Sequence, residues 1–166
     1  MSGNEDRALR EADFPVLSII STRWSDNDTY GHMNNAVHYQ LFDTAINGWI
    51  AKNIPDIVSA GEVIGVVAES QCTYFAELSF PDDVTIGLRV ERLGKTSVTY
   101  GLGVFARPQK GAETGACSIA AMGRWVHVYV DAQTRRPVPI QGQLRTLFES
   151  AQAPAHTFTT AEIQAK

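Results

Sequence analysis

Residues 23–50 read RWSDNDTYGHMNNAVHYQLFDTAINGWI and join a dense polar segment to a clear helical pattern. Asp, Asn and Gly at the density of residues 25–35 break regular structure and indicate a loop. Apolar residues then recur at helical spacing; they are Tyr39, Leu41, Phe42, Ala45, Ile46, Trp49 and Ile50. Pro55 disfavours the α conformation at Ile54, so we expect the helix to end near Asn53. Its broad apolar face favours packing against a sheet.

The chain on either side of this helix has the alternation of β-strands. An apolar run at residues 14–20 predicts a first strand that continues through Thr22 and Trp24. The later segments with strand character are residues 62–74, 84–91, 98–104 and about 116–130, and a short helix is expected near 143–150. Short connections favour antiparallel neighbours. The prediction is an α+β fold, in which one antiparallel sheet packs on one long helix.

Length and composition favour one globular domain. The chain has 166 residues, of which 44% are hydrophobic and 19% are charged, so a single core is expected. The polar N-terminal segment and the Ala- and Thr-rich C-terminal segment show no regular spacing of apolar residues. We therefore expect a flexible tail at residues 1–13, a domain at 14–150 and a second tail at 151–166.

Charge and cysteine content narrow the classes of partner. The net charge of −4 provides no general attraction for nucleic acid or anionic lipid. No apolar run is long enough to span a bilayer, and the polar N-terminus differs from a signal peptide, so the cytoplasm is the expected location. Cys72 and Cys117 fall in predicted strands and are expected to be small buried residues. The histidines lack metal-ligand spacing, so no metal is expected.

The polar segment before the helix could carry chemistry on a carbonyl group. It contains Asp26, Asp28 and His32 close to a helix start, where free backbone N–H groups favour developing negative charge. A carboxylate beside such donors can act as nucleophile or general base. The same residue types also form ordinary N-cap loops, so composition alone leaves both interpretations open.

The order of residues in this segment resembles a known family signature. Residues 23–35, followed by Tyr39 and residues 42–45, resemble hotdog-fold acyl-CoA thioesterases, specifically the 4-hydroxybenzoyl-CoA thioesterase-like branch with its Asp-x-Asp-x-x-Gly-His-x-Asn-Asn pattern. The resemblance covers roughly residues 16–150. It implies a hotdog fold, in which a long antiparallel sheet wraps around one central helix.

The same resemblance assigns roles to individual residues. Asp28 matches the catalytic carboxylate, which attacks the thioester carbonyl or activates water. Gly31, His32 and Asn35 are the expected substrate-binding residues, and a glycine suits close backbone approach to a ligand. Asp26 is expected to order the loop; if the first strand's alternation continued, it would point the same way as Asp28.

The implied function is hydrolysis of an acyl thioester to a free carboxylic acid and CoA, without a cofactor. The acyl group would be carried by CoA or an acyl-carrier protein, and a homodimer or homotetramer is implied. His32-Met33-Asn34-Asn35 replaces the apolar and aromatic stretch of the benzoyl-CoA type, which favours the general acyl-thioesterase branch.

The sequence offers several candidates for the CoA contacts and two alternatives for the function. The cations available for CoA phosphates are Arg89, Arg92, Lys95, Arg124, Arg135 and Arg136, and the sequence does not choose among them. His127, on an alternating strand, is expected to be structural. The alternatives to a thioesterase are a hotdog hydratase or dehydratase, which would pair a histidine with an acidic residue against the helix, and a non-catalytic thioester-binding protein.

Overall fold

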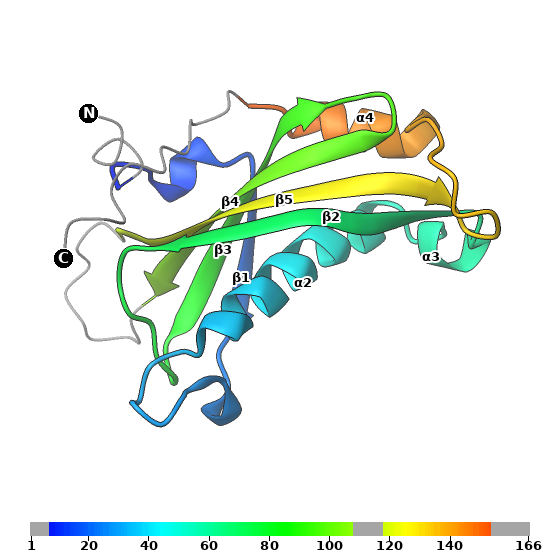
Figure 1. Cartoon of the computed structure of the whole chain (residues 1–166). Helices are drawn as coiled ribbons and strands as arrows, with labels where there is room; N and C mark the ends of the chain where they lie inside the picture. Colours follow the sequence, from blue (N-terminus) through cyan, green and yellow to red (C-terminus); the bar gives the residue numbers. More distant parts are fainter. Residues whose placement is uncertain (1–6, 108–117, 154–166) are drawn as a thin grey trace.

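A curved antiparallel sheet packs around one long helix, as the computed structural model shows for residues 7–107 and 118–153 (Figure 1). The sheet has the strand order β1-β3-β4-β5-β2, and every neighbouring pair is antiparallel. The predicted α+β class and hotdog arrangement are confirmed. The elements are η1 (Glu11–Asp13), β1 (Val16–Ser21), η2 (Trp24–Asp26), α2 (Asn35–Asn53), α3 (Ile57–Ala60), β2 (Val63–Tyr74), β3 (Asp83–Leu93), β4 (Ser97–Arg107), β5 (Ile119–Asp131) and α4 (Gly142–Ser150).

Helix α2 ends where the sequence predicts, and a local cap fixes its start. Asn34 caps it, because the Asn34 side-chain oxygen accepts a hydrogen bond of 2.9 Å from the Ala36 N–H. The helix ends at Asn53, two residues before Pro55. Phe42, on its buried face, packs so closely on β5 that a Cβ added to Gly123 would lie 2.5 Å from the Phe42 ring. The absence of a side chain at Gly123 therefore lets the helix approach the sheet.

A second, smaller core lies on the sheet face opposite α2. Phe14 covers Gly87 and Gly103, and a Cβ on either glycine would come within 2.7 Å of its ring. Leu9 is buried in the same cluster, which also contains Phe105, Ile119 and Met122. Residues 9–13 therefore differ from the loose tail expected there, because the two glycines leave room for this segment to pack.

The first three residues after α4 also pack against the sheet. The Val90 N–H donates to the Ala151 carbonyl at 2.7 Å, and the Ala153 N–H donates to the Val90 carbonyl at 3.1 Å. These bonds are possible because β1 pairs with β3 only as far as Leu88. Residues 151–153 thus continue the domain, and Cys117 and the remaining tail residues lie outside the described part of the chain.

The first strand is shorter than expected. It ends at Ser21, and the predicted continuation through Trp24 is wrong. The Thr22 hydroxyl donates to the Asp82 carbonyl at 2.6 Å, and Trp24 begins the 3-10 turn η2. Asp26 accepts the Arg23 N–H at 2.8 Å and closes this turn, so a local side-chain bond overrides the alternating pattern.

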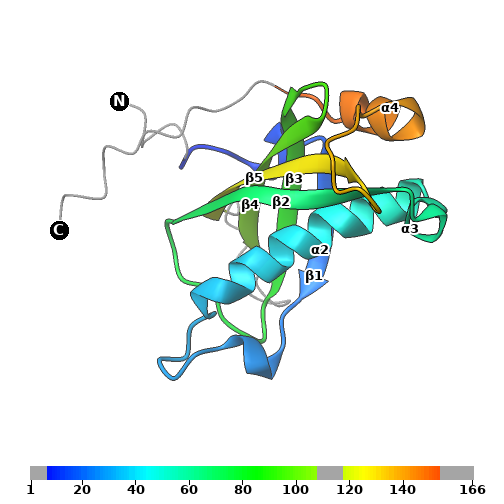
Figure 2. The same ribbon diagram turned by 45° about the vertical axis from the view of Figure 1, so that its right-hand side comes forward.

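The connection between β2 and β3 brings distant segments together. β2 is an edge strand and β3 lies beside the opposite edge, so residues 75–82 cross the end of the sheet. There they bind the loop before α2: the Met33 N–H donates to the Leu78 carbonyl at 2.6 Å, and the Phe80 N–H donates to Asn27 Oδ1 at 3.0 Å. Figure 2 shows this connection descending from β2 toward the loop below α2. In the described residues, no helix is long and apolar enough to cross a membrane.

Candidate active site

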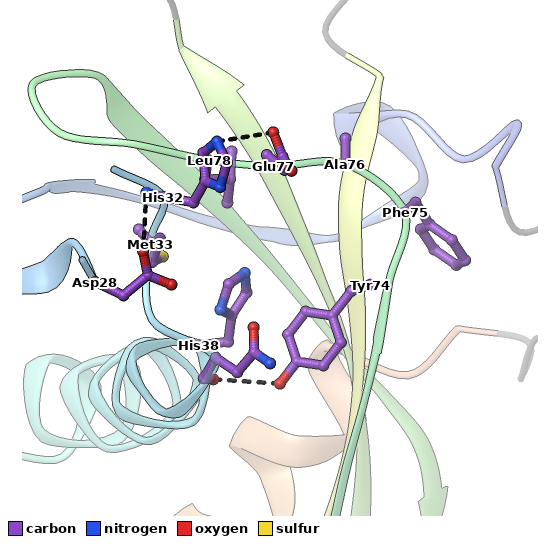
Figure 3. Close-up of a pocket in the computed structure, with 10 residues that line it drawn as sticks. Asp28, His32, Met33, His38, Tyr74, Phe75, Ala76, Glu77 and Leu78 are labelled. Carbon is purple, nitrogen blue, oxygen red and sulfur yellow. Dashed lines mark hydrogen bonds and ion pairs between the residues drawn. The ribbon is translucent and has the colours of Figure 1, made fainter. Parts of the chain in front are cut away.

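A cavity of about 310 Å³ lies at the N-terminal end of α2, between the polar loop and the β2–β3 connection (Figure 3). Its wall combines acidic, imidazole, amide and apolar side chains. The lining residues are Asp28, His32, Met33, Asn35, His38, Tyr74, Phe75, Ala76, Glu77 and Leu78. Three of the four expected site residues, Asp28, His32 and Asn35, therefore share one cavity, whereas Gly31 is not part of its lining.

The Asp28 carboxylate is fixed on one side and open on the other. Its Oδ1 accepts backbone N–H bonds from Tyr30 at 2.8 Å and His32 at 3.3 Å. No hydrogen bond to its Oδ2 is seen among residues 7–107 and 118–153. In Figure 3 the carboxylate is turned toward the side on which His38 and Tyr74 lie. A carboxylate with one anchored oxygen and one unoccupied oxygen is suited to attack or to proton abstraction.

Gly31 shapes the loop that holds Asp28. Its φ of +84° lies in the left-handed region, which glycine adopts without the usual steric cost. Its N–H donates to the Asp28 carbonyl at 3.2 Å, and the Asp28 N–H donates to the His32 carbonyl at 2.7 Å. The Gly31 and His32 N–H groups therefore bind acceptors within the loop, on Asp28.

The helix start contributes a different backbone donor. The Ala36 N–H binds the Asn34 side chain, and the Val37 N–H binds the Asn34 carbonyl at 2.9 Å. Asn35 is the first helical residue, so its N–H has no carbonyl one turn earlier to bind. Because Asn35 lines the cavity, the first turn of α2 and the positive end of its dipole border the cavity.

The opposite wall is formed by the end of β2 and its connection. The Tyr74 hydroxyl donates to the Asn35 carbonyl at 3.2 Å, which joins β2 to α2. Burial, followed by the effects of Cys72 and Tyr39, raises the pKa of Tyr74, which keeps its hydroxyl protonated. Burial also raises the pKa of Cys72 to about 11, so this half-buried thiol is a poor nucleophile at neutral pH. At the rim, His32 Nε2 lies 3.0 Å from Glu77 Oε2.

The cavity also contains His38, which the sequence did not identify as a site residue. His38 is only 3% exposed, and neither ring nitrogen has a hydrogen-bond partner within the described chain. Burial lowers its pKa, and the nearby carbonyls of Asn34 and Asn35 offset this only in part. It was missed because it shares the buried helix face of Leu41 and Phe42 and there resembles a core position. The available signal was an ionisable side chain within an apolar stripe.

Asp26 has the structural role expected of it. Its buried carboxylate accepts hydrogen bonds from the Arg23 guanidinium at 2.7 and 3.0 Å, and it does not line the cavity. Burial alone would raise the pKa of Asp26, but the hydrogen bonds and charge of Arg23 outweigh burial and lower it. His127 is likewise a core residue, 2% exposed, whose Nε2 accepts from the Trp125 indole N–H at 2.9 Å.

The six candidate CoA cations do not line this cavity. Arg89 is buried, and its guanidinium binds the Glu91 carboxylate at 2.8 Å, so it is not available to a phosphate. Arg124 pairs with Glu69. The other four, Arg92, Lys95, Arg135 and Arg136, lie at or beyond the ends of β3 and β5 farthest from the β2–β3 connection. Arg7 does not line the cavity either: its guanidinium lies 5.6 Å from the centre of the Phe75 ring, and that ring packs against the second core and points away from Asp28 and His38 (Figure 3).

No group of three or more His, Cys, Asp or Glu side chains suited to a metal ion is found in the described ranges. The reactive groups that the cavity presents are a carboxylate, an imidazole and backbone donors. Together these groups can position a carbonyl, present a base or nucleophile to it and stabilise negative charge on its oxygen.

Comparison with known proteins gives the chain a family. Residues 22–148 match the model of the thioesterase-like superfamily. The crystal structure of the PA5185 protein from Pseudomonas aeruginosa is 41% identical, covers 87% of this chain and 96% of its own, and has a TM-score of 0.79. A thioesterase from Thermus thermophilus, solved with coenzyme A and Zn, is 27% identical over 84% of this chain and 96% of its own, with a TM-score of 0.68.

A Bacillus subtilis relative, the protein YsmA, is 26% identical over 86 residues. That match spans 52% of this chain and 58% of YsmA, so the chain spans less than two thirds of this curated relative. The family match extends from the end of β1 to α4 and includes the whole polar loop and cavity. By this match and the observed fold, the chain belongs to the thioesterase-like superfamily.

Proposed function

We propose that the protein is an acyl-CoA thioesterase that hydrolyses an acyl thioester to a free carboxylic acid and CoA, with Asp28 as nucleophile or general base. The observation that carries this proposal is the environment of Asp28. Two backbone N–H groups hold one carboxylate oxygen, and the side chain lines a cavity at the start of a 19-residue helix. Membership of the thioesterase-like superfamily supports the reaction type.

Two routes are compatible with this geometry. In the first, Asp28 Oδ2 attacks the acyl carbon and the C–S bond breaks to release the CoA thiolate. Water then hydrolyses the mixed anhydride, which regenerates the Asp28 carboxylate and frees the carboxylate product, and the remaining proton of the water goes to the thiolate. In the second, Oδ2 removes a proton from water, the water oxygen bonds to the acyl carbon and the thiolate leaves and takes up the proton. In both, negative charge develops on the carbonyl oxygen, which the Asn35 N–H and the helix dipole would stabilise.

The cavity wall suits the acyl part of a thioester, and a relative indicates the carrier. Met33 and Leu78 provide apolar surface for the acyl chain. Because a homologous thioesterase was solved with coenzyme A, CoA is the carrier we propose, and this agrees with the cytoplasmic location expected from the sequence. Equal or faster turnover of acyl-carrier-protein thioesters would identify the other carrier.

One observation favours a second candidate, a hotdog hydratase. His38 and Asp28 line the same cavity, and a histidine with an acidic residue against the helix is the pair that this alternative requires. The two reactions are distinguished with crotonyl-CoA: a hydratase removes the absorbance of the conjugated double bond without releasing thiol, whereas a thioesterase releases thiol.

The test of the proposal measures thiol release from a panel of acyl-CoAs. Asp28→Asn keeps the shape of the side chain and removes its charge, so kcat should fall by roughly 10²–10⁴ while the melting temperature stays close to that of the wild type. Asp43→Asn is the control, because Asp43 is an exposed carboxylate on the solvent side of α2. Turnover near the wild-type value in Asp28→Asn would remove Asp28 from the mechanism.

A further inference from the structure

His38 combines three properties that the mechanism above does not use. It is 97% buried, since only 3% of it is exposed, and both ring nitrogens are without hydrogen-bond partners among the described residues. It also lines the cavity that contains Asp28. Figure 3 shows the His38 side chain between Asp28 and Tyr74, and its ring lies edge-on to Tyr74 with 4.9 Å between the ring centres.

The described part of the chain does not satisfy this imidazole. The Tyr74 hydroxyl donates to the Asn35 carbonyl, so that hydrogen atom is already used. The backbone carbonyls of Asn34 and Asn35 lie close enough to raise the pKa of His38 in part, but neither forms a hydrogen bond of good geometry with a ring nitrogen. A buried polar group without a partner is rare and costly. Its position in a cavity wall points to a partner that arrives in the cavity.

We propose that His38 contacts the substrate, and that its imidazole donates a hydrogen bond to the carbonyl oxygen of the thioester. This inference rests on the proposed thioesterase function. A neutral imidazole has one N–H donor and one acceptor nitrogen, and a thioester carbonyl only accepts, so the contact uses the N–H. Burial of His38 lowers its pKa, so the ring is neutral at pH 7 and donates without transferring its proton.

The contact would assist the chemical step as well as binding. When the Asp28 oxygen or a water molecule adds to the acyl carbon, the carbonyl oxygen gains negative charge. A fixed donor interacts more strongly with that charge than with the uncharged carbonyl. His38 would then act together with the Asn35 N–H, one donor coming from a side chain and the other from the helix start.

The chain provides a matched control in His127. It is as deeply buried as His38, at 2% exposed, its Nδ1 also lacks a partner in the described residues, and burial likewise lowers its pKa. It differs in that its Nε2 accepts from Trp125 and that it does not line the cavity. A variant at His127 therefore reproduces the loss of a buried imidazole without changing the site.

The kinetic test compares three variants with the wild type on its best acyl-CoA substrate. His38→Leu should lower kcat/KM by roughly 10²–10³, as expected for loss of one oxyanion donor. His38→Gln, which keeps an N–H donor, should recover part of that loss. His127→Gln should lower the melting temperature and leave kcat/KM within about twofold of the wild type. A folded His38→Leu enzyme with wild-type turnover would overturn the proposal.

A binding test on the unmodified protein does not depend on the stability of the variants. Acetonyl-CoA keeps a carbonyl but has no thioester to hydrolyse, and propyl-CoA lacks the carbonyl. In protein with ¹⁵N-labelled histidine, acetonyl-CoA should shift the His38 ring nitrogen signals, whereas propyl-CoA should not, and the His127 signals should stay in place with both. Equal responses to the two ligands, or no response at His38, would exclude the carbonyl contact.

The two tests separate this inference from the proposed function. If the wild type releases thiol from an acyl-CoA and His38 neither responds to acetonyl-CoA nor affects turnover, the His38 contact is wrong and the thioesterase function stands. If no acyl thioester is hydrolysed but His38 responds only to acetonyl-CoA, the carbonyl contact stands and the hydrolase function is wrong.

Discussion

At the residue scale, two aspartates that are two positions apart have different environments. The alternation of an extended strand would point Asp26 and Asp28 the same way, but the 3-10 turn η2 ends at Asp26 and separates them. Asp26 is turned into the protein against Arg23, and Asp28 is turned into the cavity. One carboxylate therefore stabilises the loop, and the other is available for chemistry.

Asp26→Asn should lower stability more than turnover. The substitution removes the charge that binds Arg23 and should lower the free energy of unfolding by roughly 1–3 kcal/mol at pH 7, with kcat reduced much less than in Asp28→Asn. Urea denaturation and steady-state kinetics on the two variants measure both effects. A severe loss of kcat in a stable Asp26→Asn protein would show that the catalytic carboxylate is Asp26.

The same substitution has a pH dependence whose sign follows from Arg23. The pKa of Asp26 is lower in the folded protein than in the unfolded chain, where it is about 3.9. The stabilisation is therefore fully present above that value and is lost as the pH falls through the folded pKa. The difference in unfolding free energy between wild type and Asp26→Asn should accordingly shrink from pH 6 toward pH 3. A difference that grows in acid would contradict this assignment.

At the element scale, the helix and strands could be predicted from the sequence better than the cavity wall. The sequence predicts α2 because Leu41, Phe42 and Ile46 mark its buried face and Pro55 marks its end. The position of Tyr74 opposite Asn35 depends on which strands pair, since β2 joins β5 rather than β3. Local periodicity carries no information on that choice. For the same reason the sequence indicated Asp28 but not the wall that completes its site.

The contact between α2 and β5 gives a test of how tightly these elements pack. Gly123→Ala would place a Cβ 2.5 Å from the fully buried Phe42 ring, so the helix or the ring must move. We expect a loss of about 1–3 kcal/mol in unfolding free energy, typical of overpacking a core. Gly48→Ala is the control: a Cβ there meets no atom within 4 Å, and alanine in a helix should stabilise by about 0.5–1 kcal/mol. Urea denaturation of both variants measures the two changes in unfolding free energy. Equal changes would show that Phe42 and Gly123 are not tightly packed.

At the scale of the whole molecule, the sheet has two edges of unequal length. β1 contributes six residues to one edge, and β2 contributes twelve to the other. β2 also exposes Val63, Val66 and Val67, each more than one third accessible. A long edge strand with unpaired backbone groups and apolar side chains is a surface that proteins usually cover. Since β2 ends in Tyr74, which lines the cavity, a second copy on this edge would lie close to that cavity.

We therefore expect the protein to form a homodimer through β2, or a tetramer built from such dimers. Light scattering after size exclusion should give a mass of at least twice the 18.2 kDa of one chain. Val67→Lys should weaken the assembly, because two lysines would be buried where the apolar edges meet, and turnover should fall with it as the cavity loses its neighbouring subunit. Ile19→Lys is the matched control, since Ile19 is an exposed apolar residue, 61% accessible, on the shorter edge. Dissociation by Ile19→Lys but not by Val67→Lys would place the dimer on β1, and a fully active monomer would show that one chain contains the complete site.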